Sequence, residues 1–491
     1  MTATASEALP NVTVAIVTRG RAQVLARALI GVSQIDYPTY EIVVVGDLPA
    51  IKDCDVPDWI ARQVRYVRFD EANICAARNH AIRVASGEII AFLDDDAVPE
   101  PTWLRELVRP FSTPAIAAVS GCVRDVDGIA FEWCGGLFDR SADEYPLSET
   151  SDIVTLSASD QTSADRYLAL RGVNVAFCRD ALMEIGGFDE AIRYYLDETD
   201  VAIRLAGAGH HAAFTRRAEV HHLRMPNAQR GHLQMPGNQH EIGAAKGFFC
   251  AQHLSEKDRP AALRRFRARR CAELDPQMRL GVVRTSDRDR VDAELAAGWA
   301  EGVQRKSTRL SVSEAPAAKF TPFDAPPQRL RMALTTGWGV AAIRRARRFA
   351  AALARLGHVV SCFSPVSGPW PQRVAFENGV WMHTGGTWTL PVRDTDGLMA
   401  LGRAARARAE MQRVAATRPP DVALTSLSRA RKTECTAISV SPSGAALALS
   451  LREENAAQER QIRELLQSVA ESDIEAAYRA SSVDSAQDAR V

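Results

Sequence analysis

The sequence has 491 residues, of which 46% are hydrophobic and 24% charged, and its formal net charge is zero. This length predicts two or three domains, and the charge balance gives no indication of nucleic acid or an anionic membrane as a partner. No uncharged apolar run approaches the roughly 20 residues of a membrane span, and the first residues lack the pattern of a signal peptide. The nine cysteines are scattered without CxxC spacing. We therefore expect a cytoplasmic protein with reduced thiols, in which Cys122 packs as a core residue.

The first hundred residues alternate between predicted strands and predicted helices. The expected strands are apolar and rich in β-branched residues, and the expected helices carry apolar residues at helical spacing. In chain order, the strands are 12–17, 41–45, 64–68 and 89–93, and the helices are 22–32 and 73–85. This alternation predicts an α/β domain with a mostly parallel, doubly wound sheet.

Three consecutive aspartates, Asp94, Asp95 and Asp96, follow the fourth strand. Carboxylates at the end of a buried strand are costly unless a cation lies there, and ligands of open α/β sheets bind at that end. Oxygen ligands suit Mg²⁺ or Mn²⁺, so a metal that holds a diphosphate is one interpretation. The alternative is an acidic turn before the helix that we expect to open at Trp103.

Three segments of this region together resemble the amino-terminal half of a family 2 glycosyltransferase of GT-A fold. They are 14–21, 76–82 and 85–96, which ends in Phe-Leu-Asp-Asp-Asp. The resemblance implies that Asp94 and Asp96 bind the metal and that the donor is a nucleotide-diphosphate sugar. The residues it places at the donor are Thr18, Arg19, Asp47, Arg78, Asn79, Asp94 and Asp95. The assignment of Asp47 departs from the family pattern, because Gly46 occupies the usual acid position, and a solvated turn aspartate explains Asp47 equally well.

A second group of segments, 171–179, 183–190 and 195–205, resembles the acceptor side of the same family. Gly172 and Asn174 fall on the acceptor-side strand. Glu198 takes the position of the catalytic base, although Asp197-Glu198 reverses the commoner order of the two acids. Asp197 and Asp200 would position the base or the acceptor. Acids in the first turn of a helix are also favoured by the helix dipole, so a structural role is the alternative.

A histidine pair, His221 and His222, ends this part of the chain. Relatives of this family place a histidine here as a metal or diphosphate ligand. Side chains alternate along a strand, so only one of the two would face the site, and by position we favour His222.

The remaining chain is predicted to contain four further regions. The catalytic domain spans 10–225, and it is followed by a helical extension (226–306), a linker (307–328), a Rossmann-like α/β unit (329–430) and a helical or disordered tail (431–491). The α/β unit has expected strands at 332–334, 358–363 and 420–424, with a helix at 340–356. It is similar to the amino-terminal half-domain of family 4 (GT-B) glycosyltransferases. A helix over 449–477 is a candidate for self-association.

The leading hypothesis is a metal-dependent, inverting glycosyltransferase that moves a sugar from a nucleotide-diphosphate donor to an acceptor hydroxyl. The family resemblance implies a carbohydrate or lipid-linked glycan acceptor, polysaccharide or glycoconjugate biosynthesis, and a cytoplasmic location, either free or peripheral at the inner face of the membrane. The alternatives are a nucleotidyltransferase of related fold and a non-catalytic sugar-nucleotide-binding or scaffold protein. A nucleotidyltransferase usually has a glycine-rich basic loop after its first strand, which Thr18 to Arg21 barely provides.

Overall fold

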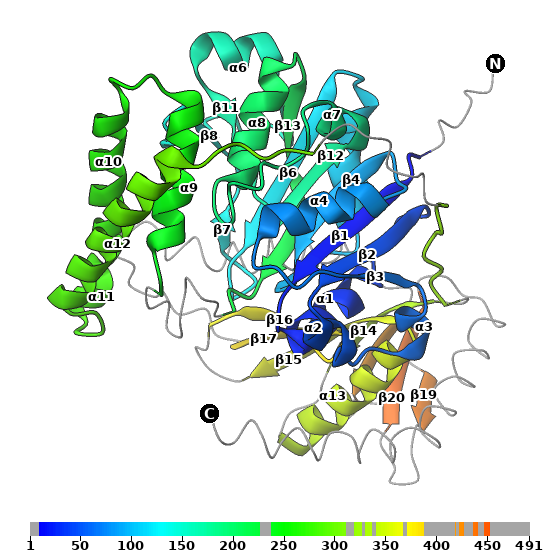
Figure 1. Ribbon diagram of the computed structural model, residues 1–491. Helices are drawn as coiled ribbons and strands as arrows, with labels where there is room; N and C mark the ends of the chain where they lie inside the picture. The colour runs from blue at the N-terminus through cyan, green and yellow to red at the C-terminus, as the bar shows by residue number, and fades with distance from the viewer. Residues whose placement is uncertain are drawn as a thin grey trace.

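The computed structural model describes residues 9–225, 237–310, 319–326, 329–335, 340–366, 371–386, 418, 422–426, 436–439 and 446–451. A large central sheet carries helices on both faces, and the helices that follow it in the chain stand beside one end of it (Figure 1). A second, smaller sheet lies below the first in the same view.

The first unit is built on a mixed, mostly parallel sheet with the strand order β10-β13-β6-β12-β4-β1-β2-β3, to which β5 and β7 add at β13 and β6. The strands are β1 (Val12–Thr18), β2 (Tyr40–Gly46), β3 (Val64–Arg68), β4 (Ile89–Asp94), β5 (Ala97–Pro99), β6 (Ile116–Arg124), β7 (Phe131–Trp133), β10 (Ile153–Leu156), β12 (Asn174–Cys178) and β13 (His211–His222). Strands β1 to β4 pair in parallel, whereas β12 runs antiparallel between β4 and β6. A separate small sheet contains β8 (Gly136–Phe138), β9 (Glu144–Pro146) and β11 (Tyr167–Leu168).

Helices cover both faces of the main sheet because its central strands are apolar on both sides. On one face α1 and α5 pack through Leu25, Leu29 and Trp103, and on the other α4, α7 and α8 pack through Ile82, Leu182 and Val201. The bounds are α1 (Ala22–Val32), α2 (Leu48–Lys52), α3 (Asp58–Ala61), α4 (Ile74–Val84), α5 (Trp103–Val108), the 3-10 helix η1 (Arg109–Ser112), α6 (Ala158–Ala164), α7 (Arg179–Glu184) and α8 (Asp197–Gly207). The predicted α/β fold with a mostly parallel sheet is confirmed, and each expected element of the first hundred residues is present.

The helices expected over 226–306 form a separate group in the described residues from 237 onward. They are α9 (His240–His253), α10 (Arg259–Ala272), α11 (Asp275–Arg279) and α12 (Thr285–Gln304). Helices α9 and α12 approach closely because glycines lie where they meet. A Cβ atom at Gly302 would come within 1.9 Å of the Ala244 carbonyl oxygen, so no larger residue fits there. We therefore expect this pair to act as one rigid element.

The segment 307–328, predicted as a linker, is in its described parts packed against the first unit. Leu310 is buried in the core that contains α4 and α8, and Phe323 is buried in the core on the opposite face. The Phe323 ring stacks on Tyr40, and its backbone N–H donates to the Tyr40 carbonyl at 2.6 Å. This segment is therefore part of the fold in those places and not a free spacer.

The second unit has the strand order β16-β17-β15-β14-β18-β20-β19. Its elements are β14 (Arg331–Thr335), α13 (Val340–Arg355), β15 (Val359–Val366), β16 (Arg373–Glu377), β17 (Val380–Gly386), β18 (Val422–Ser426), β19 (Thr436–Ser439) and β20 (Ala446–Leu451). The helix predicted from Leu449 is wrong at its start, because Leu449 and Leu451 pair with β18 as part of β20. Residues 452–491, which hold the rest of the predicted helix and disordered tail, lie outside the described residues. Among the described residues, none of the helices combines the length and apolar character needed to cross a bilayer.

The two units share a buried interface. Trp381 and Phe376 of the second unit form an apolar cluster with Val98 of the first. The Gln34 side chain accepts from the Trp381 indole at 3.0 Å and donates to a second-unit carbonyl at 2.7 Å. Arg418 lies with its Nε 3.0 Å from a carboxylate oxygen of Glu100, and both side chains are almost fully buried. The second unit therefore packs directly against β5, the short strand that follows Asp96.

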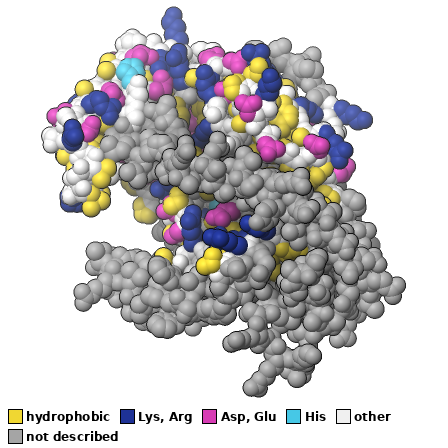
Figure 2. Space-filling view, turned by 90° about the horizontal axis from the view of Figure 1, so that it is seen from below, with side chains coloured by type: hydrophobic (Ala, Val, Ile, Leu, Met, Phe, Trp, Pro, Cys, Tyr) yellow, Lys and Arg dark blue, Asp and Glu magenta, His cyan; other side chains and the backbone are white. Residues whose placement is uncertain are grey.

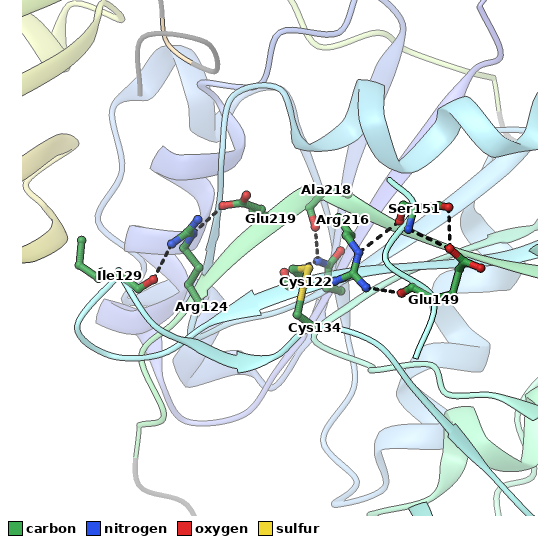
Figure 3. The surroundings of a disulfide bond; sticks show 10 residues. Cys122, Arg124, Ile129, Cys134, Glu149, Ser151, Arg216, Ala218 and Glu219 are labelled. Atoms are coloured by element: carbon green, nitrogen blue, oxygen red, sulfur yellow. Dashed lines mark hydrogen bonds and ion pairs between the residues drawn. A yellow bond between two sulfur atoms is a disulfide. The ribbon is translucent and has the colours of Figure 1, made fainter. Parts of the chain in front are cut away.

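One cysteine pair departs from the expected reduced state. Cys122 on β6 forms a disulfide with Cys134, which follows β7 (Figure 3). Six other cysteines in the described residues are free, and four of them, including Cys75 and Cys362, are buried. The expectation of a free core thiol is thus wrong for Cys122, whose partner lies 12 residues further along the chain.

Candidate active site

Three predicted metal ligands meet at the carboxyl end of β4. Asp94 and Asp96 each place a carboxylate oxygen, and His222 a ring nitrogen, so that all three atoms lie within 4.8 Å of one another. Strand β4 ends at Asp94, and β5 begins directly after Asp96 and pairs with the end of β13, opposite His222. Asp94 is 31% exposed, whereas the other two side chains are nearly buried. Two carboxylates and an imidazole suit Mn²⁺ or Mg²⁺, so the residues fit a divalent cation.

His221 points to the other side of β13, as alternation along a strand requires. Its Nε2 lies 2.8 Å from a carboxylate oxygen of Glu100, and its ring packs against Trp381 with centroids 5.0 Å apart. A cavity of about 170 Å³ lies between the two units here, and its lining includes His221, His222 and Arg373. The structure therefore brings His222, and not His221, to the two aspartates.

Asp95 is directed away from the cluster. Its carboxylate accepts from the Thr18 hydroxyl at 2.6 Å and forms an ion pair with Arg21, which also approaches Asp96 at 3.4 Å. The structure thus places Thr18 beside Asp95, behind the cluster. Arg21 was missed as a site residue, although it stands in the same turn as Thr18, because a single arginine in a turn carries no specific signal.

Hydrogen bonds and nearby positive charge, chiefly from His222, favour the ionised form of Asp96. Burial alone would raise the pKa of Asp96, but the hydrogen bond and charge of His222 outweigh burial and lower the pKa to about 2. Burial likewise opposes the charged form of His222, yet its hydrogen bonds to Asp96 and Glu132 raise the pKa to about 9. Glu132, on β7, is a further residue that sequence reasoning missed, because no motif surrounds it.

Arg78 joins the two predicted acid groups. It is buried on α4, forms a close ion pair with Asp197, and holds its Nη2 3.6 Å from Asp94. The rings of Phe92 and Phe188 lie against its guanidinium at 5.5 and 5.4 Å. Because Arg78 approaches Gly172, a Cβ there would fall 2.4 Å from the guanidinium. A side chain at Gly172 would therefore crowd the Arg78 guanidinium. The acceptor-side role of Gly172 stays a prediction.

Glu198 lies at the start of α8 after a strained backbone. Tyr195 and Leu196 have φ angles of 75° and 68°, a region that non-glycine residues seldom adopt and that is common at functional sites. Burial raises the pKa of Glu198 to about 8, and the negative charge of Asp197 adds to the shift. A carboxylate with a pKa in this range can accept a proton near neutral pH.

Asp200 does not reach the same space. It is fully buried, and its two carboxylate oxygens are occupied by Arg204 at 2.6 Å and by His253 of α9 at 2.8 Å. The structure assigns Asp200 to the junction between α8 and the helical region.

The remaining predicted residues are held by the fold. Asp47 caps α2 by accepting from the Ala50 amide, and it also accepts from the Gly20 amide at 2.9 Å. The Arg19 side chain donates to the Asp70 carbonyl.

Two amides predicted at the site are buried in backbone contacts. Asn79 accepts from the Phe188 amide and donates to its carbonyl, each at 2.9 Å, and so anchors the turn that precedes α8. Asn174 accepts from the Trp103 indole at 2.8 Å and donates to two carbonyls at 2.9 Å. Both amides hold segments together, and neither is accessible.

Comparison with known proteins gives a family match within the first unit. Residues 13–152 match the model of the family described as "Glycosyl transferase family 2", which confirms the resemblance seen in the sequence. The O-antigen biosynthesis protein RfbC of Myxococcus xanthus is 24% identical over 232 residues, 43% of this chain and 18% of RfbC. The glucosyl-dolichyl phosphate glucuronosyltransferase of Haloferax volcanii is 26% identical over 176 residues, 32% of this chain and 50% of the relative. The chain thus spans half or less of the length of these relatives.

Among solved structures, a mannosyltransferase of Pyrobaculum calidifontis in complex with GDP-Man and Mn²⁺ is similar to this chain. It has 19% sequence identity and a TM-score of 0.37, and the match covers 61% of this chain and 88% of that one.

Proposed function

We propose that this chain is a metal-dependent glycosyltransferase that moves a sugar from a nucleotide-diphosphate donor to an acceptor hydroxyl with inversion. One observation carries the proposal: Arg78 holds Asp94 of the metal-ligand cluster on one side and Asp197, next to Glu198, on the other. A site for a diphosphate and a site for a base are thereby fixed relative to each other. The family match of residues 13–152 supports the same reaction class.

Asp94, Asp96 and His222 would hold Mg²⁺ or Mn²⁺. When bound, such a cation neutralises charge on a leaving diphosphate. Arg78, buried and positively charged, lies between Asp94 and Asp197 and forms an ion pair with each of them. Thr18 and Arg21 hold Asp95 behind the cluster, which leaves the exposed edge of Asp94 facing the donor.

Glu198 acts as the general base. It takes the proton of an acceptor hydroxyl, and the oxygen then forms a bond to the anomeric carbon while the bond to the diphosphate breaks. The electron pair leaves with the nucleoside diphosphate. Because attack and departure occur on opposite faces, the anomeric configuration is inverted. A carbohydrate or lipid-linked glycan is the acceptor class that we propose.

A panel of sugar nucleotides with and without Mn²⁺ tests the proposal. We expect Mn²⁺-dependent release of a nucleoside diphosphate from one donor, with product configuration opposite to that of the donor by NMR. Release of pyrophosphate from a nucleoside triphosphate and a sugar phosphate would instead identify a nucleotidyltransferase. Absence of turnover with retained donor binding would indicate a binding or scaffold protein.

A further inference from the structure

Strand β7 contains one residue more than the part of β6 that it pairs with. Trp133 lies opposite Val123 and Phe131 lies opposite Arg124, so Glu132 between them has no partner residue on β6. This is a single-residue β-bulge, a device that redirects a side chain and that is common next to active sites. The redirected Glu132 carboxylate lies 2.8 Å from Nδ1 of His222, 90 residues further along the chain.

The bulge is fixed at both ends. On one side the disulfide between Cys122 and Cys134 joins β6 to the residue that directly follows β7 (Figure 3). On the other side the Asp125 amide donates to the Ala130 carbonyl at 2.9 Å. Trp133 also packs against Phe214 of the core, with ring centroids 5.5 Å apart. The short strand is therefore anchored on both sides of Glu132.

The geometry around His222 divides its two ring nitrogens between two carboxylates. Nδ1 faces Glu132 at 2.8 Å, and Nε2 faces Asp96 at 3.3 Å. When a bound cation displaces the Nε2 proton, Nδ1 keeps its proton and donates to Glu132, and the Nε2 lone pair is directed into the cluster. Metal-binding histidines usually donate their second N–H to a carboxylate or carbonyl in this way. Arg224, 3.0 Å from the same Glu132 oxygen, balances the negative charge of Glu132.

We infer that Glu132 is a positioning residue that fixes the tautomer and orientation of His222, so that Nε2 binds a divalent cation together with Asp94 and Asp96. The inference rests on the proposed function, because it assumes that these three residues hold a metal ion. Glu132 is 25% exposed and reaches the cluster through His222.

Titration of the purified full-length chain with Mn²⁺, with free Mn²⁺ followed by electron paramagnetic resonance, tests the inference without an activity assay. Loss of a carboxylate that supports a metal ligand typically weakens metal binding by about 10- to 100-fold. We expect Glu132→Gln to weaken Mn²⁺ binding by this factor, and Glu132→Asp, which keeps the charge but is shorter, to show a smaller loss. In turnover assays the half-maximal Mn²⁺ concentration should rise, while kcat at saturating Mn²⁺ stays near that of the unmodified protein.

Glu149→Gln is the matched control, because Glu149 lies near the disulfide and its carboxylate accepts from the neighbouring Thr150 and Ser151 (Figure 3). The bond from Arg216 to Glu149 goes to the backbone carbonyl, which the substitution keeps. This variant should bind Mn²⁺ like the unmodified chain. If the unmodified chain binds Mn²⁺ and both Glu132 variants bind it equally well, the role of Glu132 is overturned while the metal site stands. If the unmodified chain binds no Mn²⁺, the metal-dependent function itself fails. Should Glu132→Gln not fold, the Glu132→Asp titration decides alone.

Discussion

The acids at the end of β4 and the acids at the start of α8 differ in how the surrounding chain compensates their charge. At α8, Asp197 pairs with Arg78, and Asp200 pairs with Arg204 and His253. Of the three acids in the first turn of α8, Glu198 is the one that forms no ion pair with the described residues. At β4, Asp94 and Asp96 share one space with His222, and Asp94 remains 31% exposed.

This difference indicates what each cluster can do. Acids whose oxygens face one another around a common point are suited to hold a cation. A buried carboxylate that has no ion pair and lies beside another acid has a raised proton affinity, because burial and the like charge both disfavour its ionised form. Each of the following variants changes one acid of one cluster and tests its role, from the largest expected effect to the smallest.

Replacement of Asp96 by Asn should abolish Mn²⁺-dependent binding of nucleoside diphosphate. The change removes a ligand charge from the cluster and also one of the two carboxylates that bond to His222. Calorimetry with UDP and GDP, with and without Mn²⁺, measures the loss, and the thermal midpoint shows whether the fold survives. An unchanged metal-dependent affinity would refute the ligand role.

Replacement of Glu198 by Gln should lower kcat by about 10² to 10⁴, the usual contribution of a general base. Donor affinity and Mn²⁺ dependence should change little, because Glu198 stands on the α8 side of Arg78. In the unmodified protein, kcat/KM should rise with pH, reach half its maximum near the Glu198 pKa of about 8 and level off above it, since only the deprotonated carboxylate can accept the proton. If Glu198→Gln retains near-normal turnover, Glu198 is not the general base.

Replacement of Asp197 by Asn should have a smaller effect on the rate and a distinct effect on its pH dependence. Removing the Asp197 charge takes away one cause of the raised Glu198 pKa and leaves Arg78 with Asp94 as its ion-pair partner. The rising limb of the pH–rate profile should therefore move to lower pH. If Asp197→Asn is inactive and Glu198→Gln is active, Asp197 is the general base.

Replacement of Asp200 by Asn should leave the chemistry of the folded enzyme unchanged but destabilise it. The variant leaves Arg204 and His253 with a neutral partner in a buried position, and breaking a buried pair typically costs about 3–5 kcal/mol. Urea unfolding measures the loss of free energy of unfolding, and kcat of the folded fraction should match that of the unmodified chain. A large fall in kcat would place Asp200 at the acceptor.

The surface offers a further contrast with the two clusters. On the face shown in Figure 2, basic and acidic side chains of the described residues are interspersed. This mixture matches the formal net charge of zero.

The sequence by itself determined the elements and the local groups of acids. The apolar run before Asp94 predicted a buried strand, and the order of acids after Leu196 predicted a helix start, because these patterns depend only on near neighbours in the chain. Alternation along a strand indicated that only one of His221 and His222 could face the site, and position in the chain favoured His222.

The tertiary structure decided which acids form an ion pair and which do not. Arg78 reaches Asp197 over 119 residues, His253 reaches Asp200 over 53, and Glu132 reaches His222 over 90. No local pattern encodes such pairs, because the partners meet only when the sheet and its helices have packed. The same reason explains why Cys122 finds Cys134 only through the pairing of β6 with β7.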